Sequence, residues 1–140
     1  MIWKKCEDIV FNYYNEEFGK DSLCTRFIDS ADINRLSYKA GKKFTAVDVC
    51  QPSDLLITLK GWTFYAEVKS TEDPVSVKSS LVKQQSGSRR RVLAAGGDYR
   101  YFIYSIYHKQ WYFLKAEELT TPMKWENLER YKIDYLKEPK

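Results

Sequence analysis

The sequence predicts a single domain that mixes helices and strands, an α/β or α+β fold with a central mixed sheet flanked by helices. Residues 2–18 have the periodicity of an amphipathic helix, and residues 54–69 have the pattern of a β-hairpin. A second helix is predicted over residues 75–95, and two further strands are predicted after it. The 140 residues fit one domain, 1–140, with a core over about 2–115 and a C-terminal extension over 116–140.

The first helix is predicted from an apolar stripe at helical spacing, and Gly19 is its expected end. Glu7 lies on the margin of that stripe, so it is half-turned towards the core. The simplest interpretation is an ordinary glutamate that the helix dipole favours near a helix N-terminus. The alternative is a functional residue, which the family resemblance below describes. The stripe consists of Ile2, Cys6, Ile9, Val10, Tyr13 and Tyr14.

The hairpin begins at Asp54, turns at Lys60–Gly61 and returns through an alternating strand. Glu67 and Lys69 lie two residues apart on that strand and share one of its faces. The hairpin therefore brings two carboxylates and an ammonium to one end of a sheet. Such a group suits a divalent metal and an anionic substrate, although a turn aspartate and a solvated strand face give the same pattern.

Positive charge is concentrated between residues 78 and 100, a range that contains most of the second helical stretch. Between residues 78 and 100 the only acidic residue is Asp98. This stretch is either a solvated helix face or a surface that contacts phosphates. The cations concerned are Lys78, Lys83, Arg89, Arg90, Arg91 and Arg100.

A glutamine falls near the centre of the apolar face of the same predicted helix, which starts at Val75 or Ser76. Gln85 occupies that place, and Gln84 is the alternative if the helix register differs by one residue. A buried amide needs hydrogen-bond partners, which the hairpin could supply.

Composition narrows the class of protein. Apolar residues make up 44% of the chain and charged residues 30%, which is typical of a globular domain, and the net charge of +4 favours anionic partners. No apolar run is long enough for a membrane span, and no signal peptide is recognised. The three cysteines are odd in number and widely spaced, so a disulfide framework or a zinc site is not expected. We therefore expect the protein in a reducing cytoplasm, which is that of the host cell if the protein is viral. The single histidine argues against a histidine-rich metal site.

The remaining segments are predicted more briefly. We expect strands at Leu23–Ile28, Phe44–Val49, 99–107 and 111–114, and a basic loop around Lys39, Lys42 and Lys43. His108 is expected in a turn between the last two strands. A short helix is expected at Trp125–Tyr131, in a segment that serves as a cover or a tail.

Two short motifs resemble a known signature. Pro52-Ser53-Asp54, followed thirteen positions later by Glu67-Val68-Lys69, resembles the PD-(D/E)xK nuclease motif. Within that superfamily the stretch is most similar to the archaeal and phage Holliday junction resolvases. The resemblance covers about residues 2–115 and implies a restriction-endonuclease-like αβββαβ core.

The resemblance also implies roles for individual residues. Asp54 and Glu67 would bind the metal, with the Val68 carbonyl and with Glu7 directly or through water. Lys69 would position or activate the attacking water. Gln85 matches a glutamine directed at the active site, and Glu16 and Glu17 are less suitable than Glu7 because they lie at the far end of the helix.

Arg26 and Ser30 resemble an arginine and a serine that precede the catalytic strand in the resolvases. The match departs from the family pattern, because Ser30 and Asp54 are 24 residues apart and an insertion fills the interval. Both residues are therefore only candidate DNA contacts.

The expected function is that of a Mg²⁺-dependent endodeoxyribonuclease, with Mn²⁺ able to substitute, acting on branched DNA as a homodimer in recombination or repair. One alternative is another nuclease of the same chemistry, acting on duplex or single-stranded DNA. A second alternative is a nucleic-acid-binding module without catalysis.

Overall fold

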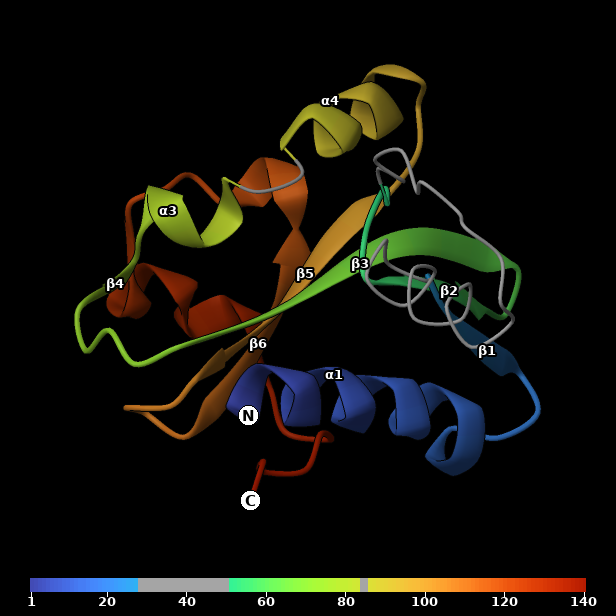
Figure 1. The fold of residues 1–140 in the computed structure, drawn as a ribbon, viewed down its shortest axis with the longest axis horizontal. Helices are drawn as coiled ribbons and strands as arrows, with labels where there is room; N and C mark the ends of the chain where they lie inside the picture. The colour runs from blue at the N-terminus through green and yellow to red at the C-terminus, as the bar shows by residue number, and fades with distance from the viewer. Residues whose placement is uncertain (28–50, 84–85) are drawn as a thin grey trace, which may run out of the picture.

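A six-stranded mixed sheet runs through the middle of this computed structural model, which describes residues 1–27, 51–83 and 86–140 (Figure 1). The strand order is β1-β2-β3-β5-β6-β8. The strands are β1 Ser22–Arg26, β2 Leu55–Leu59, β3 Trp62–Thr71, β5 Tyr99–Ser105, β6 Gln110–Lys115 and β8 Lys132–Ile133.

The pairing within this sheet is antiparallel except between β3 and β5, which are parallel. β2 and β3 form the expected hairpin, and its turn residues Lys60 and Gly61 have φ angles of 48° and 84°. Glycine adopts this left-handed region without steric cost, which is why Lys-Gly marks the turn. The predicted mixed sheet flanked by helices is confirmed.

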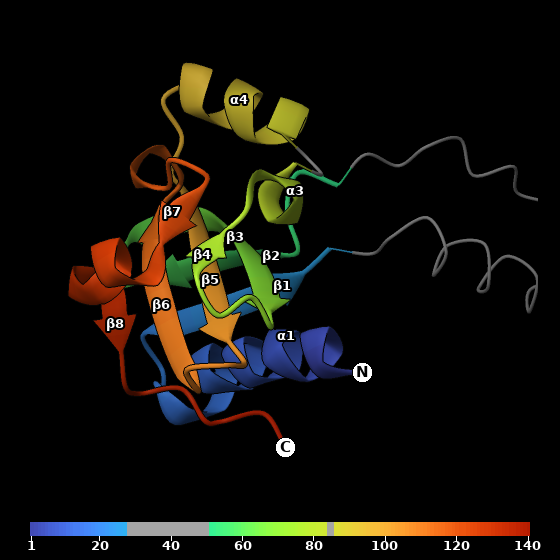
Figure 2. The ribbon, with the colours of Figure 1, turned by 90° about the vertical axis from the view of Figure 1, so that its left-hand side faces the viewer.

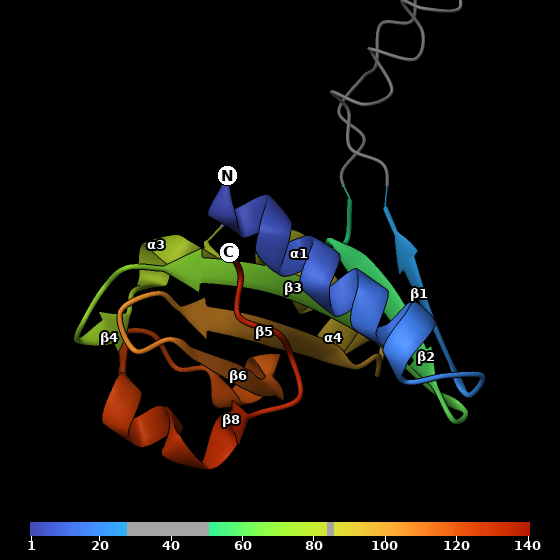
Figure 3. The same cartoon turned by 90° about the horizontal axis from the view of Figure 1, so that it is seen from below.

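Helix α1, Ile2–Asn12, covers one face of the sheet (Figure 3) and continues as a π-helical turn over Tyr13–Glu17. Gly19 follows with a φ of 102°, where the chain leaves the helix as expected. The stripe residues Cys6 and Val10 are fully buried. They pack in one core cluster with Phe64, Ala66, Val68 and Phe102.

The opposite face carries α3, Ser79–Val82, and α4, Ser86–Ala94, with the sheet between them and α1 (Figure 2). The prediction of one helix over residues 75–95 is wrong at its start. Ser76–Val77 is strand β4, which pairs with β7, Met123–Lys124. The partner strand β7 is far away in the sequence, so the local periodicity of residues 75–95 cannot indicate this pairing.

The C-terminal segment packs against a second hydrophobic core, which lies on the side of the sheet that carries α3 and α4. It contains two 3₁₀ helices, Ala116–Glu118 and Trp125–Tyr131, and the latter stands where a short helix was expected. Trp125 and Leu128 are buried together with Tyr101 and Tyr112. The division of the chain into a core and an extension stays a prediction, but these residues pack as part of the fold.

Several expectations fall outside the described residues: the strand Phe44–Val49, the basic loop at 39–43, Ser30, Gln84 and Gln85. His108 lies in the turn between β5 and β6, as expected, and one of its ring nitrogens is 3.2 Å from the Pro74 carbonyl oxygen. Across the described ranges, the helices are too short or too polar to traverse a lipid bilayer.

Candidate active site

Asp54 is fixed at the open end of the β2–β3 hairpin, one residue beyond the last ladder pair, Leu55 with Ala66. Its carboxylate oxygen Oδ2 accepts a hydrogen bond from the backbone N–H of Val68 at 2.9 Å. Its own carbonyl accepts from the N–H of Phe27 at 3.1 Å, which ties it to the end of β1. The Asp54 side chain is therefore held against the peptide that joins Glu67 to Val68.

Glu67 and Lys69 extend from β3 on the face towards α3 and α4, the same face as Tyr65. The Glu67 side chain is only 1% exposed, and its Oε2 lies 3.2 Å from Lys69 Nζ. Burial raises the pKa of Glu67 to about 7, and the nearby charge of Asp54 adds to the rise. Burial raises the pKa of Asp54 as well.

The two carboxylates thus lie close enough to repel one another when both are ionised. The ammonium of Lys69 relieves part of this repulsion, since its charge lowers the pKa of both groups. A divalent cation between Asp54 and Glu67 would relieve it further, because it favours the ionised form of each ligand.

Glu7 approaches the same place from α1, on the other face of the sheet. Burial raises its pKa to about 7, and the charge of Asp54 is the next largest cause. Its Oε1 is paired with Nε of Arg26 at 3.0 Å, and Arg26 also contacts Asp8 at 2.7 Å. The structure therefore brings Glu7 into the electrostatic field of Asp54 and gives it Arg26 as its direct partner.

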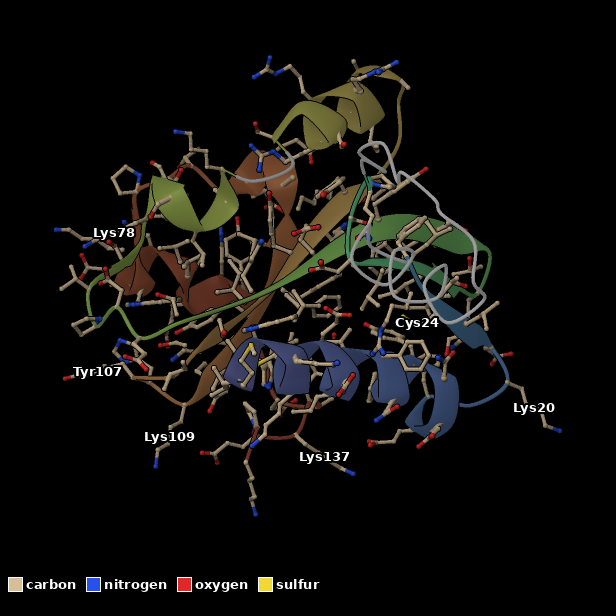
Figure 4. All side chains as sticks on the ribbon, in the orientation of Figure 1. Lys20, Cys24, Lys78, Tyr107, Lys109 and Lys137 are labelled. Carbon is tan, nitrogen blue, oxygen red and sulfur yellow. The ribbon has the colours of Figure 1, made fainter. Side chains whose placement is uncertain are left out.

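The two competing glutamates of the first helix lie elsewhere. Glu16 is exposed, and Glu17 pairs with Lys137 at 3.2 Å, on the α1 side of the molecule where Figure 4 labels Lys137. Arg26, expected as a DNA contact, forms ion pairs with Glu7 and Asp8. Its side chain is 38% exposed.

Two tyrosines of β5 complete the surroundings of the carboxylates, and sequence reasoning missed both. The Tyr99 hydroxyl donates to the Pro52 carbonyl at 2.7 Å, which holds the segment before Asp54 in place. Tyr101 is the register partner of Glu67 on the neighbouring parallel strand. The alternation of residues 99–105 was visible, but only the parallel register shows which tyrosine faces which carboxylate.

Gln51 was also missed. Its amide nitrogen Nε2 is buried, and it has no hydrogen-bond partner among the residues that the structure describes. It lies three positions before Asp54, in the segment that Tyr99 holds through Pro52.

A metal site here would be a small one. In the described parts of the chain, no three His, Cys, Asp or Glu side chains are gathered into a cage for a metal ion. Mg²⁺ does not need such a cage, because it commonly binds one or two carboxylates and keeps several waters. Asp54 and Glu67 fit that requirement, whereas Glu7 is already paired with Arg26.

The predicted DNA-contacting cations divide into two groups. Lys78, labelled in Figure 4, is 68% exposed and lies 3.1 Å from Asp73, while Lys83, Arg90 and Arg91 are exposed. Arg89 instead turns inward, where it donates to the Val82 carbonyl at 3.0 Å and to the Tyr101 hydroxyl.

Comparison with known proteins gives a structural similarity and no sequence family. No family model and no curated protein matches the chain. Among solved structures, it is similar to the 1.6 Å structure of Archaeoglobus fulgidus Hjc, a Holliday junction resolvase from an archaeal hyperthermophile, with 15% identity and a TM-score of 0.46. The match covers 92% of this chain and 84% of that one. Roles for the residues of this chain rest on the contacts described above.

Proposed function

We propose that this chain is a Mg²⁺-dependent endodeoxyribonuclease that hydrolyses phosphodiester bonds, with a preference for branched DNA. The observation that carries the proposal is the group at the hairpin end: Asp54 held on the Val68 amide beside a buried Glu67 that Lys69 pairs at 3.2 Å. Burying two carboxylates that repel one another lowers the stability of the fold. A protein that only binds DNA would gain nothing from such an arrangement, whereas a metal-dependent nuclease needs it to hold the cation.

The roles follow from chemistry and position. Asp54 and Glu67 are the proposed ligands, with the Val68 carbonyl, and a bound Mg²⁺ would polarise the phosphate and lower the pKa of its water. Lys69 would orient the attacking water and offset the negative charge that develops on the phosphate. Glu7 would hold a water of the site, while Arg26 limits the charge that accumulates there.

The proposed DNA surface is the α3 and α4 side, the face towards which Glu67 and Lys69 point. Lys78, Lys83, Arg90 and Arg91 would contact phosphates, which positions the substrate without reading its sequence. Paired cuts in a symmetric junction need two sites related by a two-fold axis, so we include a homodimer in the proposal.

The test compares a four-way junction, a flap and a linear duplex of the same sequence, each with Mg²⁺, with Mn²⁺ and with a chelator. We expect metal-dependent cleavage, fastest on the junction. Asp54→Asn and Glu67→Gln should each lose at least nine-tenths of the activity, about 1.4 kcal/mol of barrier, while DNA binding remains.

Each other outcome has a definite meaning. Equal rates on junction and duplex would identify a nuclease without structural selectivity. Binding of all three substrates without any cut in Mg²⁺ or Mn²⁺ would identify a non-catalytic module. A tenth or more of wild-type activity in either carboxylate variant would remove that residue from the site.

A further inference from the structure

Arg89 differs from the two arginines that follow it. Helix α4 has no fully buried residue among those described, and Arg90 and Arg91 are exposed on it. Arg89 is half-buried and makes two hydrogen bonds, to the Val82 carbonyl at 3.0 Å and to the Tyr101 hydroxyl. Its guanidinium also lies 5.9 Å from the centre of the Tyr101 ring. A side chain held in this way has little freedom to reach a phosphate.

The partner of Arg89 stands next to the proposed ligands. Tyr101 is 2% exposed and is paired in register with Glu67 across the parallel β3–β5 ladder. Burial raises the pKa of Tyr101, the hydrogen bond and charge of Arg89 lower it, and the charges of Glu67 and Asp54 add smaller rises. The Tyr101 hydroxyl is therefore within the field of both the arginine and the carboxylates.

The apolar side chains of α4 add partly buried contacts to these hydrogen bonds. Val92 and Leu93 are only partly buried against the second core. The two hydrogen bonds of Arg89 join α4 both to the end of α3, at Val82, and to β5. Both hydrogen bonds come from one guanidinium nitrogen, Nη1, so the end of the Arg89 side chain is held between these two elements.

We propose that Arg89 is a positioning residue of the active site and not a phosphate contact: it clamps α4 to the Tyr101 hydroxyl, next to the strand that carries Glu67 and Lys69. This rests on the proposed nuclease function. The clamp couples the helix that presents Arg90 and Arg91 to DNA with the strand pair that surrounds the carboxylates. Loss of Arg89 should therefore slow the chemical step, and loss of its neighbours should weaken the hold on DNA.

The experiment compares Arg89→Met, Arg89→Lys and Tyr101→Phe with the double variant Arg90→Met/Arg91→Met on one cleaved substrate. Arg89→Met should lower the rate at saturating DNA tenfold or more, with an unchanged slope of log affinity against log salt. Arg89→Lys should recover part of the rate because it keeps the charge. The Arg90/Arg91 variant should bind more weakly, with a slope reduced by about 0.9 for each phosphate that the protein no longer neutralises.

Two further variants separate positioning from simple loosening of α4. Val92→Ala removes an apolar contact of the same helix, and hydrogen exchange of residues 86–94 measures how far each variant loosens it. At equal loosening, Arg89→Met should lose more activity than Val92→Ala. Combining Arg89→Met with Tyr101→Phe should cost no more than the larger single effect, because both break one contact.

The inference is overturned if Arg89→Met keeps the wild-type rate and lowers the salt slope, or if Val92→Ala at equal exchange loses as much activity. In both cases the nuclease proposal stands. If the wild-type protein cuts no DNA with Mg²⁺ or Mn²⁺, the nuclease proposal and the catalytic part of this inference fall together. Hydrogen exchange then still tests whether Arg89 holds α4 against the sheet. If the exchange of α4 is unchanged in Arg89→Met, Arg89 does not hold the helix.

Discussion

Glu7 is a half-buried carboxylate that is paired with Arg26 and lies in the field of Asp54, so its contribution to metal binding can be measured by a Mg²⁺ titration. Glu7→Gln should lower cleavage several-fold and raise the Mg²⁺ concentration that gives half the maximal rate, because one nearby negative charge is lost. Glu16→Gln is the matched control, since Glu16 is exposed on the same helical segment. A Mg²⁺ titration of the three proteins on one substrate checks this. A Glu7→Gln curve that overlays the wild type would remove Glu7 from the proposed metal site.

The raised pKa values also predict how the stability of the metal-free protein depends on pH. Glu67 and Glu7 have folded pKa values of about 7, above the usual glutamate value of 4.5. The folded protein therefore binds protons more tightly than the unfolded chain between these values. Metal-free stability should be highest below about pH 4.5 with respect to these two groups, and should fall as the pH rises towards 7.

Thermal unfolding in a chelator, followed from pH 5 to pH 7.5, measures this dependence. Glu67→Gln should flatten it, whereas the exposed control Glu126→Gln should keep the wild-type slope. Added Mg²⁺ should raise the melting temperature more at pH 7.5 than at pH 5.5, because binding requires ionised carboxylates. A wild-type protein whose stability rises steadily from pH 5 to pH 7.5 would contradict the assignment.

At the scale of the element, α4 is a short basic helix in which none of the described residues is fully buried. The exposed Arg90 and Arg91 should each contribute to DNA affinity through counterion release, independently of sequence. Replacing both by methionine should reduce affinity equally for unrelated sequences and flatten its salt dependence. Binding measured at several salt concentrations tests this, with Arg130→Met, an exposed arginine of the C-terminal 3₁₀ helix, as the charge control.

The elements that the sequence predicts well are those whose cause is local. The hairpin follows from Lys60-Gly61 and the alternation of the strand after it, and α1 follows from its apolar stripe. The start of the second helical region was predicted wrongly because Ser76 and Val77 pair with Lys124 and Met123, almost fifty residues away. Local propensity cannot report such a pairing.

The same distinction applies within the candidate site. Asp54, Glu67 and Lys69 come together within one hairpin, so spacing alone placed them. Tyr101 and Arg89 reach the site through the parallel β3–β5 register and the packing of α4, and neither can be read from spacing. The inward turn of Arg89 is invisible in a run of three arginines.

At the scale of the whole molecule, the C-terminal segment is part of the packing of the second core. Leu128 is fully buried, and the Trp125 ring stacks on Tyr112 with centroids 5.1 Å apart. Leu128→Ala should destabilise the protein by about 2–5 kcal/mol through the lost burial and the cavity that remains. Chemical denaturation measures this, and the exposed Asn127→Ala should change stability by less than about 0.5 kcal/mol. Equal effects of the two changes would mean that the segment is a detachable tail.

The hairpin that unites Asp54 with Glu67 has a consequence for how the protein folds. Contacts between residues thirteen positions apart form before those that need a crossover or a docked helix, because closing a short loop costs less entropy. We therefore expect the two carboxylates to approach one another early on the folding pathway. Mg²⁺ should consequently accelerate refolding, and not only slow unfolding, which stopped-flow chevrons with and without the cation would show. If Mg²⁺ leaves the refolding rate unchanged, the two carboxylates approach one another only after the rate-limiting step of folding.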